Sequence, residues 1–189
     1  MERQKKLKIG CLFLLCMWAA GAEAATWQMV PDKSQLTFTA TQNGAAVTGE
    51  FTSFDGTISF DPQTLQDSHV DIIVDMHSLS LSYADLKTML IASDWFNVAV
   101  FPHAEFKAAE FKKINNGVYQ ANGLLTIRDK SLPTTLIFTA KDISPDKTVF
   151  SGSTVIKRTA FGIGQGEWAS TTEIKDDVAV NFSITTRRS

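Results

Sequence analysis

The chain has 189 residues, of which 18 are basic and 20 acidic, so its formal net charge is −2. No cluster of Lys and Arg interleaves with aromatic residues, which disfavours nucleic-acid binding through phosphate neutralisation. Both cysteines, Cys11 and Cys16, fall within the first 24 residues. The remaining 165 or so residues can form one domain that is stable through its core alone, without a disulfide.

Residues 1–24 have the three parts of a secretory signal peptide. A basic start precedes an apolar run over residues 9–20, and Ala22-Glu23-Ala24 supplies a small-x-small cleavage pattern. The apolar run is shorter than the roughly twenty residues that a membrane span needs. We therefore expect cleavage after residue 24 and no stable membrane insertion afterwards. The lack of cysteine in residues 25–189 favours a bacterial periplasm as the destination.

The dominant pattern in residues 25–189 is alternation of apolar and polar side chains, which is typical of half-buried antiparallel strands. Turn sequences such as Asn43-Gly44, Asp55-Gly56 and Asn116-Gly117 separate the alternating segments. Short strands at this spacing predict a sandwich or a barrel. The apolar positions that would share one face of their strands are Leu36, Phe38, Ala40, Ile58, Phe60, Val70, Ile72, Val74, Met76, Leu136, Phe138, Ala140, Val178, Val180, Phe182 and Ile184.

Residues 83–92 break this alternation and predict one short helix. Ser82 and Asp85 form a variant of the capping box, and apolar residues then follow at helical spacing. The next stretch, residues 93–102, places several large apolar side chains in a connection. This stretch either packs as a lid on the domain or lines the mouth of a pocket.

Glycine occupies every second position in one run, at Gly162, Gly164 and Gly166. This alternation predicts an extended strand with one face cleared of side chains. The cleared face either lets a neighbouring segment pack closely or makes room for a ligand. The run is not a nucleotide-binding motif, because it lacks the GxGxxG spacing and the Gly-Lys-Ser/Thr ending of a phosphate loop.

The histidines do not predict a metal site. His69 and His77 would lie about 26 Å apart on one extended strand, and their neighbouring aspartates are more simply explained as a solvated strand face. The motifs HExxH, CxxC and GxSxG are absent from the sequence. We therefore predict no catalytic residue and no metal ligand. An enzyme hypothesis would depend on Asp94, His103 and Arg158 gathering near residues 93–102.

Five segments together resemble the YceI-like family of bacterial periplasmic proteins. They occur in the order of the family and span nearly all of residues 25–189. The family more often has glycine where this chain has Asp129, which leaves the geometry of that turn open. The segments are FDGTISFDPQTLQDSHVDIIVDMHSLS (54–80), LIASDWFNVAVFPHAEFKA (90–108), GLLTIRDKSLPTTLIF (123–138), RTAFGIGQGEWAS (158–170) and DDVAVNFSI (176–184).

The resemblance implies a mainly β fold, in which residues 25–189 form a single extended antiparallel lipocalin-like β-barrel of about eight strands. It also implies a long apolar cavity that holds an isoprenoid lipid, such as a polyprenyl lipid or a polyprenyl quinone, and no cofactor beyond that ligand. Family members are often homodimers, and some are linked to stress responses. No catalytic residue is transferred by the resemblance.

The function expected on this basis is a carrier or store of an isoprenoid lipid. Two alternatives remain: an interaction protein whose apolar groove receives a partner protein, and an enzyme acting on a lipid or quinone. The candidate ligand-binding residues are Phe38, Phe60, Trp95, Phe96, Phe106, Leu125, Phe138, Phe161, Trp168 and Phe182.

Overall fold

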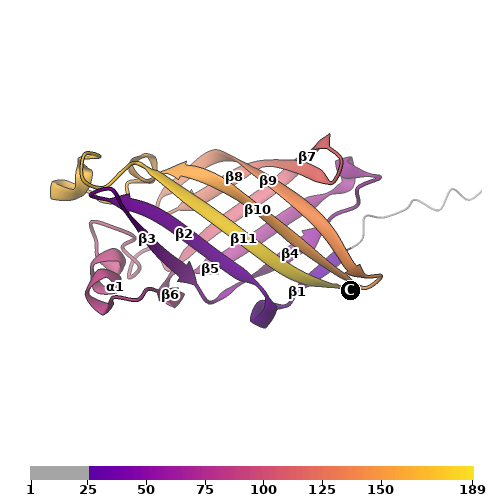
Figure 1. Ribbon diagram of the computed structural model, residues 1–189, viewed down its shortest axis with the longest axis horizontal. Coiled ribbons are helices and arrows are strands. Elements are labelled where there is room, and N and C mark those ends of the chain that lie inside the picture. The colour runs from indigo at the N-terminus through magenta and orange to yellow at the C-terminus, as the bar shows by residue number, and fades with distance from the viewer. Residues whose placement is uncertain (1–25) are drawn as a thin grey trace, which may run out of the picture.

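Strands of residues 26–189, the part of the chain that the computed structural model describes, form an elongated barrel (Figure 1). The predicted signal peptide, residues 1–24, lies outside the described residues. One α-helix, α1 (Ala84–Ile91), lies at one end of the barrel. The strands are β1 (Thr26–Met29), β2 (Gln35–Gln42), β3 (Ala45–Phe51), β4 (Phe54–Ser59), β5 (His69–Asp75), β6 (Leu79–Ser80), β7 (His103–Asn115), β8 (Val118–Ile127), β9 (Lys130–Ser144), β10 (Lys147–Lys157) and β11 (Asp177–Arg188).

Eight strands close the barrel in the order β1-β4-β5-β7-β8-β9-β10-β11, and β11 returns to β1. The described pairs are antiparallel, and the closing pair places Trp27 opposite Arg188. The other half of β11, from Ala179 to Ser183, pairs with β2. Strands β2, β3 and β6 extend the sheet from there towards α1 (Figure 1). The predicted antiparallel barrel of about eight strands is confirmed.

The alternation in the sequence matches the inside and outside of the barrel. Successive side chains of a strand point to opposite faces, so a closed sheet buries every second residue. The apolar residues predicted to share one strand face lie inward, where they line a central cavity. Ala140 is the exception among them, because it packs against the core instead.

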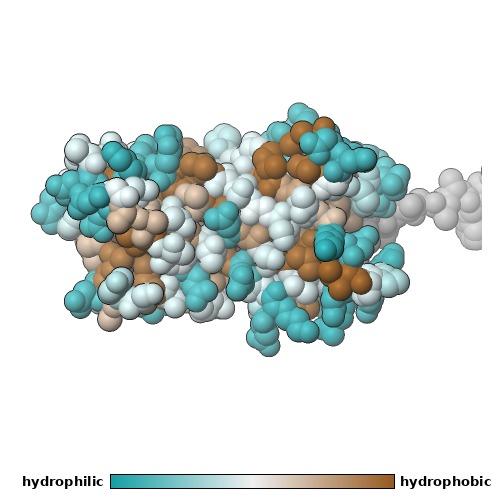
Figure 2. All heavy atoms as spheres, in the orientation of Figure 1, coloured by the Kyte–Doolittle hydropathy of each residue, from teal (hydrophilic) through white to brown (hydrophobic). Residues whose placement is uncertain are grey.

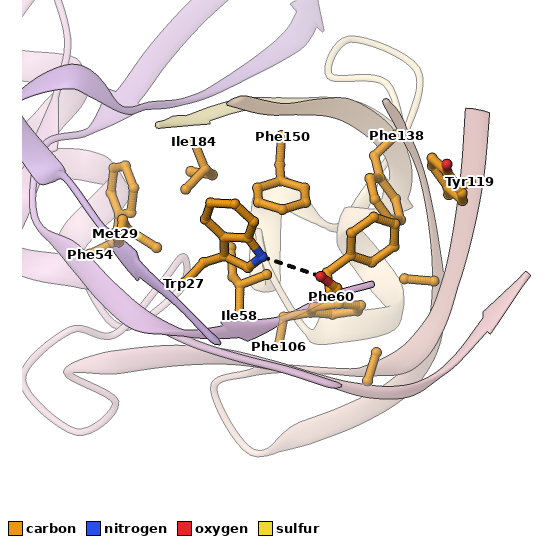
Figure 3. Packing of buried hydrophobic residues seen from close by; sticks show 12 residues of the cluster. Trp27, Met29, Phe54, Ile58, Phe60, Phe106, Tyr119, Phe138, Phe150 and Ile184 are labelled. Atoms are coloured by element: carbon orange, nitrogen blue, oxygen red, sulfur yellow. Dashed lines mark hydrogen bonds between the residues drawn. The ribbon is translucent and has the colours of Figure 1, made fainter. Parts of the chain in front are cut away.

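The interior holds two clusters of buried side chains, one towards each end of the barrel. The cluster near β1 is centred on Phe60, whose ring makes edge-to-face contacts with Tyr119, Phe138 and Phe150 at centroid distances of 5.0, 5.5 and 5.6 Å. The indole Nε1 of Trp27 donates a hydrogen bond to the carbonyl oxygen of Phe60 (3.2 Å), which ties β1 to this cluster (Figure 3).

The second cluster lies at the end of the barrel that carries α1. Leu90 of α1 is buried in it, and Leu86 and Met89 pack against it. The helix confirms the prediction over residues 83–92. The predicted capping box is wrong, because the residue at the N-cap is Tyr83 and not Ser82, and no side chain caps the helix.

The prediction of a strand over the alternating glycines is also wrong. Strand β10 ends at Lys157, and the chain continues into two 3₁₀ turns, η4 (Arg158–Phe161) and η5 (Gly166–Ala169). Gly162, Gly164 and Gly166 have φ angles of 69°, 76° and 60°. Side-chain-bearing residues rarely adopt this left-handed conformation. The alternation therefore reflects three left-handed positions in one loop.

Three further 3₁₀ turns connect strands. Their bounds are Pro31–Lys33 (η1), Leu65–Asp67 (η2) and Met76–Ser78 (η3). The sequence predicts His69 and His77 on one strand, and this is wrong. Strand β5 ends at Asp75, and His77 lies in η3.

Candidate functional site: an apolar cavity along the barrel

A cavity of about 250 Å³ occupies the interior between the two clusters. Its lining reaches from Phe60 and Phe150, near β1, to Leu86 and Met89 of α1. On β11 alone it touches the inward residues from Val178 to Ile184, which is about 20 Å of strand at roughly 3.4 Å per residue. The cavity is therefore long compared with its volume.

The wall of the cavity is almost entirely hydrocarbon. Leu, Ile, Val, Met and Phe side chains supply most of the lining residues. A polar molecule would lose its hydrogen bonds with water in such a space, whereas an apolar chain would gain from leaving water. The polar residues of the lining are Thr37, Gln42, Glu105, Thr134, Thr154 and Arg158.

Most of the candidate ligand-binding residues lie on this wall. Trp95 and Phe96 line it from the connection after α1, so this connection covers the barrel end and also contacts the cavity. The other candidates that line the cavity lie on strands, and the alternation of apolar and polar residues in the sequence placed them on the inward face. The candidates that line the cavity are Phe38, Phe60, Trp95, Phe96, Phe106, Leu125, Phe138 and Phe182.

Two candidates do not line the central cavity. Phe161 is buried in the cluster near α1 and contacts a second pocket between β9 and β10. Trp168 packs its ring against that of Trp95, with a centroid distance of 5.8 Å. Both residues were proposed from the glycine run, whose predicted strand does not exist.

Other lining residues were missed by the sequence reasoning. Phe150 and Ile156 of β10 lie inward, but the small inward residues Gly152 and Thr154 between them weaken the alternation. Ile163 and Ile174 reach the cavity from the loop that follows β10. No local pattern in the sequence indicates where that loop folds back.

Arg158 organises this loop from within. Its side chain is 2 % exposed, and its guanidinium donates five hydrogen bonds to backbone carbonyl oxygens. Burial lowers the pKa of Arg158, and the negative charge of Asp176 acts in the opposite direction. The acceptors are the carbonyls of Lys175 (3.3 Å from Nε), Ile163 and Gly164 (2.9 and 3.3 Å from Nη1), and Ser170 and Ile174 (2.8 and 3.0 Å from Nη2).

The guanidinium of Arg158 fills the space left by the missing side chain of Gly164. A Cβ atom at residue 164 would collide with Nη1 of the guanidinium. Of the two interpretations that the sequence left open, the geometry at Gly164 therefore matches close packing by a neighbouring group.

The loop of Arg158 is joined to the connection after α1. The backbone N–H groups of Gly164 and Gln165 both donate to the carbonyl of Asp94 at 2.8 Å. Arg128 adds a second link, because its Nη1 donates to the carbonyls of Trp95 and Gly162. These bonds hold two distant segments together over the α1 end of the cavity.

The conformation of Arg128 shows why this chain can have Asp129 where the family more often has glycine. The turn between β8 and β9 consists of Arg128 and Asp129, and the left-handed position is Arg128, with a φ of 56°. Asp129 does not have a positive φ. A glycine is therefore not required at residue 129 in this geometry.

The three residues of the enzyme hypothesis have different environments. The guanidinium donors of Arg158 are all directed at carbonyls, whereas the side chains of Asp94 and His103 are exposed. His103 begins β7 opposite Asp75, whose carboxylate lies 3.2 Å from Nδ1 of exposed His77. Among residues 26–189, no group of three or more His, Cys, Asp or Glu residues is arranged to hold a metal ion. The same residues include no helix long and apolar enough to span a membrane.

Comparison with protein families identifies the fold. The family model described as YceI-like domain matches residues 27–186. A UPF0312 protein of Yersinia pestis (strain Pestoides F) is 33% identical over 88 residues, which are 47% of this chain and 45% of that protein. A UPF0312 protein of Vibrio cholerae is 27% identical over 124 residues, or 62% of this chain and 65% of that protein. The match thus spans about half the length of the Yersinia relative.

Solved structures share the barrel over most of its length. BcnA of Burkholderia cenocepacia has a TM-score of 0.80 and 26% identity, and the match covers 83% of this chain and 98% of that one. The Campylobacter jejuni YceI protein has a TM-score of 0.68 and 24% identity, with 77% and 86% covered. A domain of Saccharophagus degradans described as polyisoprenoid-binding has a TM-score of 0.68 and 14% identity, with 88% and 99% covered.

Proposed function

This chain belongs to the YceI-like family, and on that premise we propose that it binds an isoprenoid lipid, as a polyprenyl chain or a polyprenyl quinone, within its barrel. The observation that carries the proposal is the long apolar cavity between the Phe60 cluster and α1. Support also comes from the Saccharophagus degradans domain of the same fold, which is described as polyisoprenoid-binding.

The energetics of such a cavity suit a flexible hydrocarbon chain. Each buried CH₂ contributes about 0.8 kcal/mol, so one five-carbon prenyl unit contributes on the order of 3–4 kcal/mol before ordering costs. The realised affinity of larger ligands falls towards about 0.3 kcal/mol per heavy atom. Several prenyl units could therefore bind tightly with few polar contacts, and the wall offers few.

The role we propose is that of a periplasmic carrier or store, without a catalytic step. The predicted signal peptide over residues 1–24 supports the periplasm as the compartment. An interior lined mostly with hydrocarbon suits an enclosed lipid better than a docked protein partner. Homodimer formation is a separate expectation from the family and does not enter the argument for the cavity.

Native mass spectrometry of the protein purified from its own periplasm tests the proposal. We expect a co-purifying isoprenoid lipid, and saturable binding of an added polyprenyl quinone to the delipidated protein. Absence of both would refute the proposal.

Two adjacent residues of β11 provide a matched pair of variants for this experiment. Val180 lines the cavity, whereas Asn181 is exposed on the outer face. Val180→Trp should fill part of the cavity and reduce binding at least tenfold, while Asn181→Trp should bind as the unmodified protein does. Equal binding by the two variants would show that the lipid is held elsewhere.

A further inference from the structure

The wall of the barrel has a gap between β9 and β10. These strands pair from Lys147 and Ser144 as far as Ser153 and Ile137. Within residues 26–189 their pairing does not continue beyond that point, although β9 begins at Lys130 and β10 ends at Lys157. We call the unpaired stretch, residues 130–136 of β9 and 154–157 of β10, the side gap.

Pro133 supplies a physical reason why the pairing does not resume at the far end of the side gap. The two-residue turn pairs Ile127 with Lys130, so the backbone groups of Lys130 face β8, and every second residue after it does the same. The backbone of Pro133 therefore faces β10. Proline has no N–H group to donate, so it is largely confined to edge strands and bulges. If the register of the paired part continued, Pro133 would lie opposite Lys157, so β9 cannot donate a ladder bond at the end of β10.

A second pocket lies in the side gap and borders the central cavity. It has a volume of about 300 Å³ and includes the exposed residues Pro133, Thr135, Val155, Lys157 and Ala160 in its lining. We call it the outer pocket. Its lining shares Thr134, Thr154 and Ile156 with that of the central cavity, so these three residues border both spaces.

The shared boundary is also a polar spot in the apolar wall. Thr134 and Thr154 lie at inward positions on the two unpaired edges, where the other strands present mostly hydrocarbon. The hydroxyl of Thr134 donates a long hydrogen bond to the carbonyl of Leu132 (3.3 Å), and it can redirect this bond to an acceptor on a ligand by rotating. On the outer side, the ammonium of Lys157 forms an ion pair with Asp177. Polarity thus increases from the cavity through the side gap to the outer pocket.

We propose that the side gap seats the polar head group of the bound lipid, which reaches the outer pocket while the isoprenoid tail stays in the central cavity. The inference rests on the proposed function and assigns a position to the head. The matching chemistry is a head whose oxygens accept hydrogen bonds from the hydroxyls of Thr134 and Thr154 and from N–H groups of the open strand edges. A quinone and a phosphate both have this chemistry, and a hydrocarbon has none.

Protection of a single thiol tests the position of the head. Thr135→Cys places a thiol in the outer pocket, and Thr139→Cys places one on the same exposed face of β9, where its pairing with β10 is intact. Both variants carry Cys11→Ser and Cys16→Ser, so that the introduced thiol is the only one. The rate of maleimide alkylation is measured without lipid and after loading with a polyprenyl quinone, a polyprenyl phosphate or squalene, an isoprenoid hydrocarbon without a head group.

We expect loading with the quinone or the phosphate to slow alkylation at residue 135 at least tenfold and to change it less than twofold at residue 139. Squalene should protect neither residue.

The quinone and phosphate arms also distinguish the two kinds of head, because Lys157→Gln should reduce protection by the phosphate more than by the quinone. Lipid that is bound by native mass spectrometry but leaves residue 135 unprotected would overturn this inference alone. Absence of any bound lipid would overturn the proposed function as well.

A paired substitution tests the hydroxyls directly. Thr134→Val and Thr154→Val together replace the polar spot with side chains of the same shape. We expect weaker binding of the polyprenyl quinone by at least tenfold and unchanged binding of squalene. Equal effects on both ligands would mean that the hydroxyls do not contact the head, and would contradict the inference.

Discussion

The guanidinium of Arg158 occupies the space that a side chain at Gly164 would need. Nη1 of Arg158 donates to the carbonyl of Gly164, and the left-handed backbone at Gly164, with a φ of 76°, brings that carbonyl within 3.3 Å. The lack of a side chain at Gly164 thus leaves room for the buried guanidinium of Arg158, whose hydrogen bonds hold the loop over one end of the cavity.

Gly164→Ala should destabilise the protein by roughly 2–5 kcal/mol. The left-handed backbone costs an L-residue about 1–2 kcal/mol, and overpacking adds about 1–3 kcal/mol. Gly44→Ala is the matched control, because Gly44 has a φ of 80° but no atom within 4 Å of a Cβ position. It should lose only the backbone contribution. Urea unfolding of both variants would measure the difference, and equal losses would show that the contact with Arg158 is unimportant.

Arg158→Met should cost at least about 3 kcal/mol, because several carbonyl groups would lose their donor inside the protein. In a domain of this size each kcal/mol lowers Tm by about 2–4 °C. Exposed Arg187→Met serves as the control and should change Tm little. A small effect at residue 158 in a thermal melt would contradict the organising role of its side chain.

Phe60→Ala should reduce stability by about 3–5 kcal/mol, because it removes the ring on which the cluster near β1 is centred. The same change opens space at that end of the cavity, so the preferred prenyl chain should become longer. Chemical unfolding measures the first effect, and competition between prenyl lipids of different length measures the second. Ile73→Ala, at a largely exposed position on β5, should show neither.

Asp176 should make the stability of the loop dependent on pH. Burial acts to raise the pKa of Asp176, but hydrogen bonds from the N–H and hydroxyl of Thr159 and the nearby charges of Lys157 and Arg158 bring it below its ordinary value. A depressed folded pKa means that the stabilisation is present above the unfolded pKa of about 3.9 and is lost as pH falls through the folded pKa.

Asp176→Asn should therefore lower Tm at pH 7, and its Tm should approach that of the unmodified protein in acid below about pH 3. Thermal melts at both pH values check this expectation. Asp32→Asn, at an exposed position in η1, is the control and should leave Tm nearly unchanged. A deficit of Asp176→Asn that persists unchanged in acid would contradict a role for the carboxylate charge.

The strands and their inward faces could be predicted from the sequence because side-chain alternation in a strand has a fixed period of two. Phe38 and Phe182, for example, lie on the cavity wall as parity predicts. The short helix was also predictable, from a local change of period at residues 83–92. These signals are local, and tertiary packing agrees with them.

The loop after β10 could not be predicted because its conformation depends on distant partners. Gly162 and Gly164 alternate as in a strand, but Arg158 gathers carbonyls from as far along the chain as Lys175. Only the folded barrel brings Asp94 within reach of the same loop. The side gap was equally hidden, since Pro133 is informative only once its backbone is known to face β10.

The short strand β1 has a consequence for how the protein folds. It joins β4 to β11, and Trp27 meets Arg188, so the closing contact links the two ends of the described chain. Closure must therefore wait until β11 is available, and contacts of such long sequence separation slow folding. Until then, the edges of β1 and β10 that pair with β11 remain open to other strands. A nascent chain that still lacks β11 would therefore be vulnerable to aggregation, and pairing of β11 with β1 completes the barrel.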